Sequence, residues 1–235
     1  MGNFFIDAHL HVTPPLLPYL QTIPCIANAD CPEEYHWLRA NATPHMTISV
    51  GIHPWKAAVT SWAEMEPLLR SCAVIGEIGL DRVWCDTDLE IQRDIFHRQL
   101  ELAHSLGTPV ILHTKGMEQE ILHTIRQYPN RYLVHWYSCG AWQRDYIDLG
   151  CWFTVGPDLL STPYVEQLAK TVPLNRLLLE SDGMDAISWA QKSPLAPCDY
   201  PNYMRQHLQA IALLRGLPPH VLLAQITENL NCFLR

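Results

Sequence analysis

Residues 73–81 read Ala-Val-Ile-Gly-Glu-Ile-Gly-Leu-Asp, an apolar run that carries one central carboxylate, Glu77. Such a run predicts a buried β-strand. A carboxylate is costly inside it unless the group is paired or bound to a metal. We therefore expect Glu77 to be a metal ligand, able to bridge two cations with its two oxygens. The alternative is an ion pair with a Lys or Arg inside the fold.

Strand-like runs alternate with helix-like stretches along the chain. We predict strands at residues 4–8, 23–27, 46–51, 73–78, 109–113, 132–135, 151–155 and 176–180. Helices are expected at 89–106, 118–127, 164–170, 203–215 and 220–233. A long loop is expected at 183–201, over the mouth of the barrel that these elements predict. The eight alternations predict an α/β protein, a single (β/α)8 TIM barrel in which residues 1–235 form one domain. Its chemistry is expected at the C-terminal ends of the strands.

Residues with metal-binding side chains stand at the ends of these runs. The expected metal ligands are His9, His11, Glu77, His113, His135 and Asp182. His9 and His11 lie two apart on a strand and therefore share a face. Asp7 is expected beneath them as a carboxylate that orients a ligand.

The last predicted strand ends in two carboxylates. Asp182 is expected to bind a metal and to take the proton of an attacking water, so Asp182 and Glu77 are the predicted catalytic residues. Glu180 shares the face of Asp182 and is expected to support the site.

Four further residues are predicted to line the substrate pocket. His53 follows a strand in Gly51-Ile52-His53-Pro54, on the functional rim. Lys115 lies two residues after His113 and can meet a substrate anion, or it is a solvated loop residue. Trp136 and Tyr137 follow His135 and can stack on a base or sugar, or they pack in the core.

Composition limits the classes of function. Hydrophobic residues make up 48% of the chain, which is typical of a globular protein, and the net charge of −8 excludes a global positive field for nucleic acid. Phosphate recognition must therefore be local. No apolar stretch reaches the roughly 18 residues of a membrane span, and the start lacks the pattern of a signal peptide. The eight cysteines form no CxxC, so we expect reduced thiols in a cytoplasmic protein without a membrane partner.

The motifs resemble those of the TatD family of metal-dependent deoxyribonucleases, in the broader group of amidohydrolase-like hydrolases. DAHLH at 7–11 resembles the family's DxHxH, GIHP at 51–54 its GxHP, and GEIGLD at 76–81 its most specific string. PVILH at 109–113 and ESD at 180–182 also resemble family segments. The resemblance implies two divalent cations, one held by His9, His11, Glu77 and Asp182, the other by Glu77, His113 and His135.

Four imidazoles favour Zn, Mn, Ni or Fe over Mg, although Mg is often used with this family. The chain departs from the family where His113-Thr114-Lys115 replaces His-x-Arg and where Met184 replaces a proline. A Lys binds phosphate as a point charge, without the bidentate geometry of Arg.

The leading hypothesis is a TatD-like metal-dependent hydrolase that cleaves DNA or a smaller phosphodiester. A hydrolase of a non-nucleic amide, ester or lactone is the first alternative. A non-catalytic barrel that keeps its metals for stability or partner binding is the second.

Overall fold

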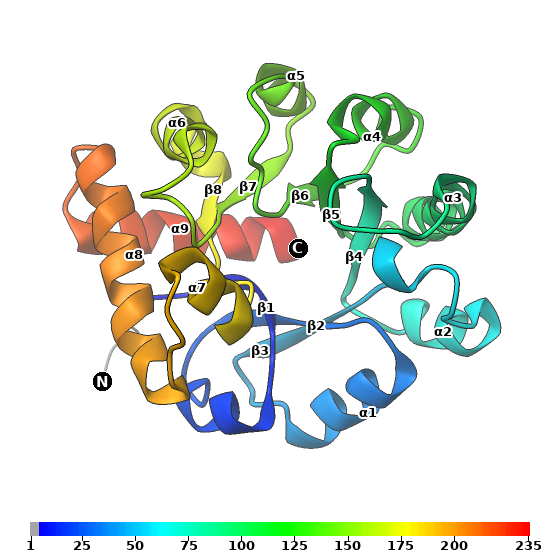
Figure 1. Cartoon of the computed structure of the whole chain (residues 1–235), viewed down its shortest axis with the longest axis horizontal. Coiled ribbons are helices and arrows are strands. Elements are labelled where there is room, and N and C mark those ends of the chain that lie inside the picture. Colours follow the sequence, from blue (N-terminus) through cyan, green and yellow to red (C-terminus); the bar gives the residue numbers. More distant parts are fainter. Residues whose placement is uncertain (1–4) are drawn as a thin grey trace.

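Eight parallel strands form the inner layer of the molecule, and helices surround them (Figure 1). The computed structural model describes residues 5–235. The strands are hydrogen-bonded in chain order from β1 to β8. Their bounds are Asp7–His11 (β1), Cys25–Ala29 (β2), Met46–Val50 (β3), Val74–Asp81 (β4), Val110–Lys115 (β5), Tyr132–Val134 (β6), Trp152–Val155 (β7) and Leu177–Leu179 (β8).

The sheet curves until its last strand lies beside its first. The backbone N–H of Asp182 donates to the carbonyl of His9 over 3.1 Å, just beyond the end of β8. The (β/α)8 barrel predicted from the sequence is therefore confirmed, and the barrel is nearly closed. This closure brings residues that are far apart in sequence to one rim.

Helices follow the strands around the outside (Figure 1). Their bounds are Pro32–Asn41 (α1), Trp62–Leu69 (α2), Leu89–Leu106 (α3), Glu118–Ile125 (α4), Gln143–Asp148 (α5), Pro163–Thr171 (α6), Met184–Gln191 (α7), Tyr200–Leu214 (α8) and Pro219–Leu234 (α9). Short 3-10 turns lie at Pro14–Tyr19 (η1), Pro54–Lys56 (η2), Leu174–Arg176 (η3) and Pro197–Asp199 (η4).

Helix α3 has the bounds that its periodicity predicted. The Asp88 side chain accepts from the backbone N–H of Glu90 at the start, and Gly107 ends the helix with φ of 66°. A side-chain acceptor at the N-cap and a left-handed glycine after the last turn are common helix boundaries.

Two expectations about element bounds were wrong. Strand β1 runs from Asp7 to His11 and not over 4–8, whose first residue, Phe4, lies outside the described residues. The stretch 183–201 is not a continuous loop, because it contains α7 and η4. Helix α7 has 8 residues and ends at Gln191, because the next residue, Lys192, has a left-handed backbone. Its apolar pattern therefore extends over only two turns.

Within residues 5–235, no single helix is long and apolar enough to cross a bilayer; Pro197–Leu214 and Pro219–Leu234 meet that test only together, as a pair bent by 101°. All eight cysteine thiols are free.

Candidate metal centre and active site

A cavity of about 680 Å³ opens at the carboxyl ends of the strands. Its lining includes five of the six predicted ligands, which are His11, Glu77, His113, His135 and Asp182. His9 is fully buried directly beside them. The structure therefore brings all six predicted ligands together at the mouth of the barrel.

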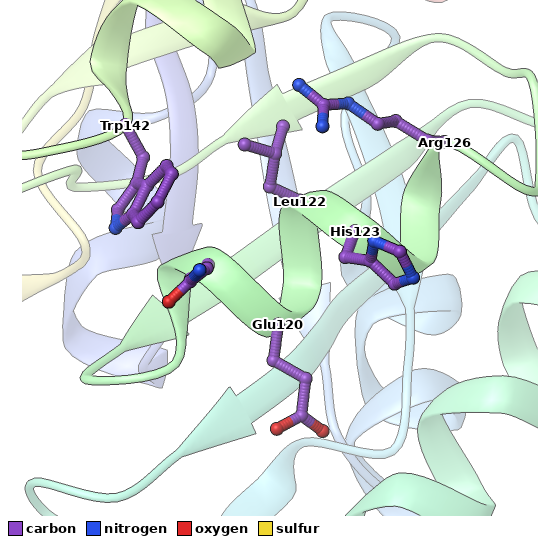
Figure 2. A pocket seen from close by; sticks show the side chains of 6 residues that line it. Glu120, Leu122, His123, Arg126 and Trp142 are labelled. Carbon is purple, nitrogen blue, oxygen red and sulfur yellow. The ribbon is translucent and has the colours of Figure 1, made fainter.

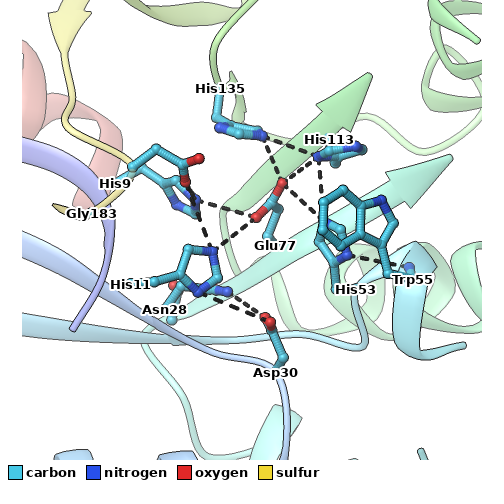
Figure 3. A network of polar contacts seen from close by, with 12 residues as sticks. His9, His11, Asn28, Asp30, His53, Trp55, Glu77, His113, His135 and Gly183 are labelled. Carbon is cyan, nitrogen blue, oxygen red and sulfur yellow. Dashed lines mark hydrogen bonds and ion pairs between the residues drawn. The ribbon is translucent and has the colours of Figure 1, made fainter. Parts of the chain in front are cut away.

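Glu77 stands at the centre of this cluster, and its two oxygens face different imidazoles (Figure 3). Oε2 lies 3.2 Å from Nε2 of His9 and 3.5 Å from Nε2 of His11. Oε1 lies 2.5 Å from Nδ1 of His113 and 2.6 Å from Nε2 of His135. The carboxylate thus divides the imidazoles into two sets.

Each set contains enough ligand atoms to hold a metal ion. In the first, one ligand atom each from His9, His11, Glu77 and Asp182 lies within 4.8 Å of all the others. In the second, the same holds for His53, Glu77 and His113, and Nε2 of His135 lies 3.2 Å from Nδ1 of His113.

The unpaired atoms of the cluster fit a cation. Nε2 of His9 and Oδ1 of Asp182 are buried, lie 3.3 Å apart, and have no hydrogen-bond partner. Buried polar atoms without a partner are rare in folded proteins. A cation between them would satisfy both, and imidazole with carboxylate is a donor set suited to Zn, Mn, Ni or Fe.

His53 belongs to the second set by its position and is also held through its other ring nitrogen. Its Nδ1 accepts from the backbone N–H of Trp55 over 3.2 Å, which leaves Nε2 as the nitrogen that can donate. That Nε2 faces Oε1 of Glu77 at 3.3 Å. His53 therefore acts as a hydrogen-bond donor into the cavity, where the sequence placed it as a pocket residue.

Asp81 orients His113, a role that was not predicted from the sequence. Its Oδ2 lies 3.0 Å from Nε2 of His113 and accepts from Nε1 of Trp55 over 2.6 Å. Its Oδ1 accepts from the backbone N–H groups of Val83 and Trp84. Burial opposes the charge of Asp81, but the hydrogen bonds, with His113 first, hold its pKa below the usual range. The sequence contains a pattern that could have predicted this role, because Glu77 and Asp81 lie four residues apart in one strand and therefore share a face.

Buried glutamines of α3 hold the two turns that carry these side chains. Gln92 accepts from the N–H of Asp81 and donates to its carbonyl, at 2.9 and 3.1 Å. Gln99 binds the N–H and carbonyl of Ile52 in the same way, at 2.7 and 3.1 Å. Asp81 and His53 are thus fixed from the outer layer.

The supporting carboxylates lie beneath the ligands. Oε1 of Glu180 lies 3.5 Å from Nδ1 of His135, and Glu180 is fully buried. Asp7 accepts from the N–H and hydroxyl of Ser181 and from the Tyr200 hydroxyl. Asp7 therefore fixes the turn that carries Asp182, whereas the prediction from the sequence was that it orients His9 or His11 from beneath. Burial, only partly offset by these hydrogen bonds, raises its pKa to about 7.

Charges within the cluster set its protonation when no cation is bound. Burial opposes the charged form of Glu77, but the surrounding imidazoles, His135 first, hold its pKa well below the usual value. Burial also disfavours protonated His9, yet Asp182 and Glu77 raise its pKa well above the usual value. The carboxylates and imidazoles of the cluster therefore favour each other's charged forms.

Two predicted substrate-binding residues, Lys115 and Trp136, do line the cavity. Nζ of Lys115 donates to the carbonyl of Trp136 over 2.6 Å and to Oγ of Ser138 over 3.2 Å. Burial lowers the pKa of Lys115, although Glu180 and other acids oppose this. Nε1 of Trp136 donates to Asp158 over 2.6 Å.

Tyr137, the fourth predicted substrate-binding residue, does not line the cavity. Its ring is fully buried and packs edge-on against Tyr146 and Phe153, with centroids 5.7 and 5.8 Å away. Its hydroxyl donates to the carbonyl of Ala141. The left-handed backbone of Trp136, with φ of 38°, turns the chain so that the next side chain enters the core.

A second hollow, of about 320 Å³, lies over α4 (Figure 2). Its charged groups are already paired, since Glu120 binds Arg93 and Arg126 binds Asp145. We assign the chemistry to the barrel mouth.

Comparison with known proteins places this site in a family. The family model described as TatD related DNase matches residues 22–235. The chain belongs to the TatD-related DNase family. The matched segment holds Glu77, His113, His135 and Asp182, whereas His9 and His11 lie before it.

Individual relatives agree with this placement. The human 3'-5' RNA nuclease TATDN2 is 25% identical over 76% of this chain, and the 3'-5' ssDNA/RNA exonuclease TatD of Edwardsiella piscicida is 30% identical over 63%. The matches span 25% and 58% of those proteins. The crystal structure of the TatD homologue YjjV of Escherichia coli K12 superposes with a TM-score of 0.80, 22% identity and 96% coverage of each chain. This last likeness supports the fold.

Proposed function

We propose that this protein is a metal-dependent hydrolase that cleaves phosphodiester bonds, in a nucleic acid or in a smaller phosphodiester. The observation that carries the proposal is the central position of Glu77, whose two oxygens face two separate sets of imidazoles. Two named relatives are nucleases, which supports a nucleic-acid substrate class.

Two divalent cations are proposed, one among His9, His11, Glu77 and Asp182, the other among Glu77, His113 and His135. When bound, such cations polarise a phosphoryl oxygen and lower the pKa of a water molecule. Imidazole ligands favour Zn, Mn, Ni or Fe over Mg.

Asp182 is proposed as the proton acceptor. Burial raises its pKa, but the neighbouring imidazoles, His9 first, lower it by more, so the group is a carboxylate at neutral pH. Its unpaired Oδ1 can take a proton from the attacking water. The water oxygen then bonds to phosphorus, the ester P–O bond breaks, and the leaving oxygen takes a proton. His53 is placed to donate from Nε2 to a phosphoryl oxygen.

Metal content and turnover test the proposal together. Elemental analysis of purified protein should find about two cations per chain, with cleavage of bis(p-nitrophenyl) phosphate and of a single-stranded oligonucleotide. Asp182→Asn should lower kcat by about 100- to 10,000-fold. Glu77→Gln should lose bound metal as well as activity. Glu166→Gln is the matched control, because that carboxylate pairs with Lys170 on the surface.

The alternatives predict different results. Cleavage that survives both active-site substitutions contradicts the proposal. Bound metal without phosphodiester turnover favours an amide, ester or lactone substrate, to be assayed on a panel. Bound metal with no turnover of any substrate, and a sharp fall in thermal stability on chelation, favours a structural role.

We also propose that the chain acts as one domain in the cytoplasm. The shared sheet of eight strands supports a single domain, and the eight free cysteines support a reducing compartment. Limited proteolysis and fractionation of cells test these two statements.

A further inference from the structure

Three tryptophans form a continuous wall on one side of the cavity. The ring of Trp189, carried by α7, lies edge-on to Trp136 with centroids 5.7 Å apart and to Trp84 with centroids 6.2 Å apart. All three line the same cavity as Glu77. We call Trp136, Trp189 and Trp84 the tryptophan wall.

The outer part of the wall leaves apolar rings in solvent. Trp84 is 60% exposed and Trp189 is 56% exposed. Neighbouring exposed indoles forgo the burial that aromatic rings normally gain, and contiguous exposed apolar surface typically marks a binding site.

The inner part of the wall is held in place. Nε1 of Trp136 donates to Asp158, and Nζ of Lys115 lies 5.2 Å from the centroid of the Trp136 ring. Gly156 makes room for that ring, because a Cβ there would lie 2.3 Å from its Cδ1. The wall is therefore a built surface beside the metal-binding cluster.

The charges around the cavity do not suit a long polyanion. Its lysines, Lys56 and Lys115, both already have partners in the protein. Nζ of Lys56 lies 3.6 Å from Asp30 and 3.3 Å from Glu34. Nζ of Lys115 donates to the carbonyl of Trp136 and to the hydroxyl of Ser138. Asp158 and Asp185 add negative charge to the lining. A strand that binds through successive phosphates needs a cation for each. Among the described residues, this lining offers no lysine or arginine that is free of such contacts.

We propose that the tryptophan wall is the specificity element of this hydrolase, stacking on one aromatic base beside the scissile phosphate and restricting good substrates to short phosphodiesters. Stacking on indole rings requires no charge and tolerates any base. This inference rests on the proposed function and names its substrate class.

Two esters with the same leaving group test the stacking. Thymidine 5'-(p-nitrophenyl phosphate) carries a base, and methyl p-nitrophenyl phosphate does not. The wild-type protein should prefer the first in kcat/KM by about 5- to 150-fold, the value expected from one stacked base. Trp189→Ala and Trp84→Ala should each move that ratio toward one, mainly by raising KM for the thymidine ester.

Trp142→Ala is the matched control, since Trp142 is also exposed but lines the hollow over α4. Metal content and thermal unfolding of each variant show whether it folds. A ratio that is near one in the wild type, or unchanged in both wall variants, overturns the inference. If neither ester is cleaved with any metal, the proposed phosphodiesterase activity itself is refuted, and the inference about the wall is refuted with it.

A length series provides an independent measurement. With oligothymidylates of two to sixteen nucleotides, kcat/KM should level off within the shortest members of the series, and KM should depend only weakly on salt. A kcat/KM that climbs through the whole series and falls steeply with salt overturns the inference. Sedimentation of the wall variants tests one further outcome. If the wild type is a dimer, the variants are monomers, and the ratio of kcat/KM for the two esters is unchanged, the wall is a subunit interface and the inference is overturned.

Discussion

Gly156→Ala should destabilise the protein and damage the active-site mouth through a single methyl group. The backbone of Gly156 is not in the left-handed region, so the substitution introduces no backbone strain. Its Cβ, however, would lie 2.3 Å from Cδ1 and 2.5 Å from Cγ of Trp136. The indole cannot easily move away, since its Nε1 is bonded to Asp158 and its ring packs against Trp189.

Overpacking of this kind costs about 1–3 kcal/mol in free energy of unfolding. For a chain of this length, each kcal/mol lowers Tm by about 2–4 °C, so we expect a fall of about 2–12 °C. The displaced indole should also weaken any preference for a base-bearing ester. Differential scanning calorimetry of the metal-loaded protein measures the first effect, and the ester ratio measures the second.

Gly140→Ala is the matched control for this experiment. Its Cβ would lie 2.5 Å from Cε1 of Tyr164, a comparably close approach to an aromatic ring. Tyr164 is 51% exposed and can swing into solvent, so the cost should stay within about 0.5 kcal/mol. If Gly156→Ala matches this control in Tm and keeps the wild-type ester ratio, the reasoning about a fixed Trp136 is refuted.

Three further predictions concern the metal centre and the core. Asp81→Asn should weaken cation affinity by about 10- to 100-fold in a chelator competition, because Nε2 of His113 loses its carboxylate partner; unchanged affinity would contradict that positioning role. Burial lowers the pKa of His11, but Asp30 first and then the neighbouring acids raise it from 6.5 to about 9. The interaction of protonated His11 with these acids therefore stabilises the metal-free protein fully below pH 6.5, and this stabilisation is lost as pH rises through about 9. Cation affinity should rise over the same pH window, because the cation displaces the proton of His11. Calorimetric titrations in which cation binding releases no protons would exclude this. Tyr137→Phe should cost about 1 kcal/mol in unfolding free energy and leave KM unchanged, since its hydroxyl donates to the backbone carbonyl of Ala141 and not into the cavity. A raised KM would contradict this assignment and indicate that Tyr137 contacts substrate.

Much of the ligand set was readable from the sequence because the fold is regular. Each strand of a (β/α)8 barrel delivers its carboxyl end to the same rim, so polar residues at the ends of apolar runs converge whatever their separation in the chain. Glu77 and Asp182 are 105 positions apart in sequence, yet both lie within hydrogen-bonding range of His9. Strand bounds were less readable, because β4 and β5 continue through polar residues that point into the mouth.

The roles of supporting and lining residues were decided by tertiary structure. Asp81 acquires its role only because β4 extends far enough to meet His113, and Trp189 acquires its role only because α7 lays it against Trp136. Tyr137 enters the core because its neighbour adopts a left-handed backbone, which no periodicity encodes. Sequence by itself determined which chemical groups reach the rim, since that follows from strand order and local hydrophobicity. Only the folded chain determined which partner each group meets there, because those contacts join segments whose distances depend on the packing of the whole barrel.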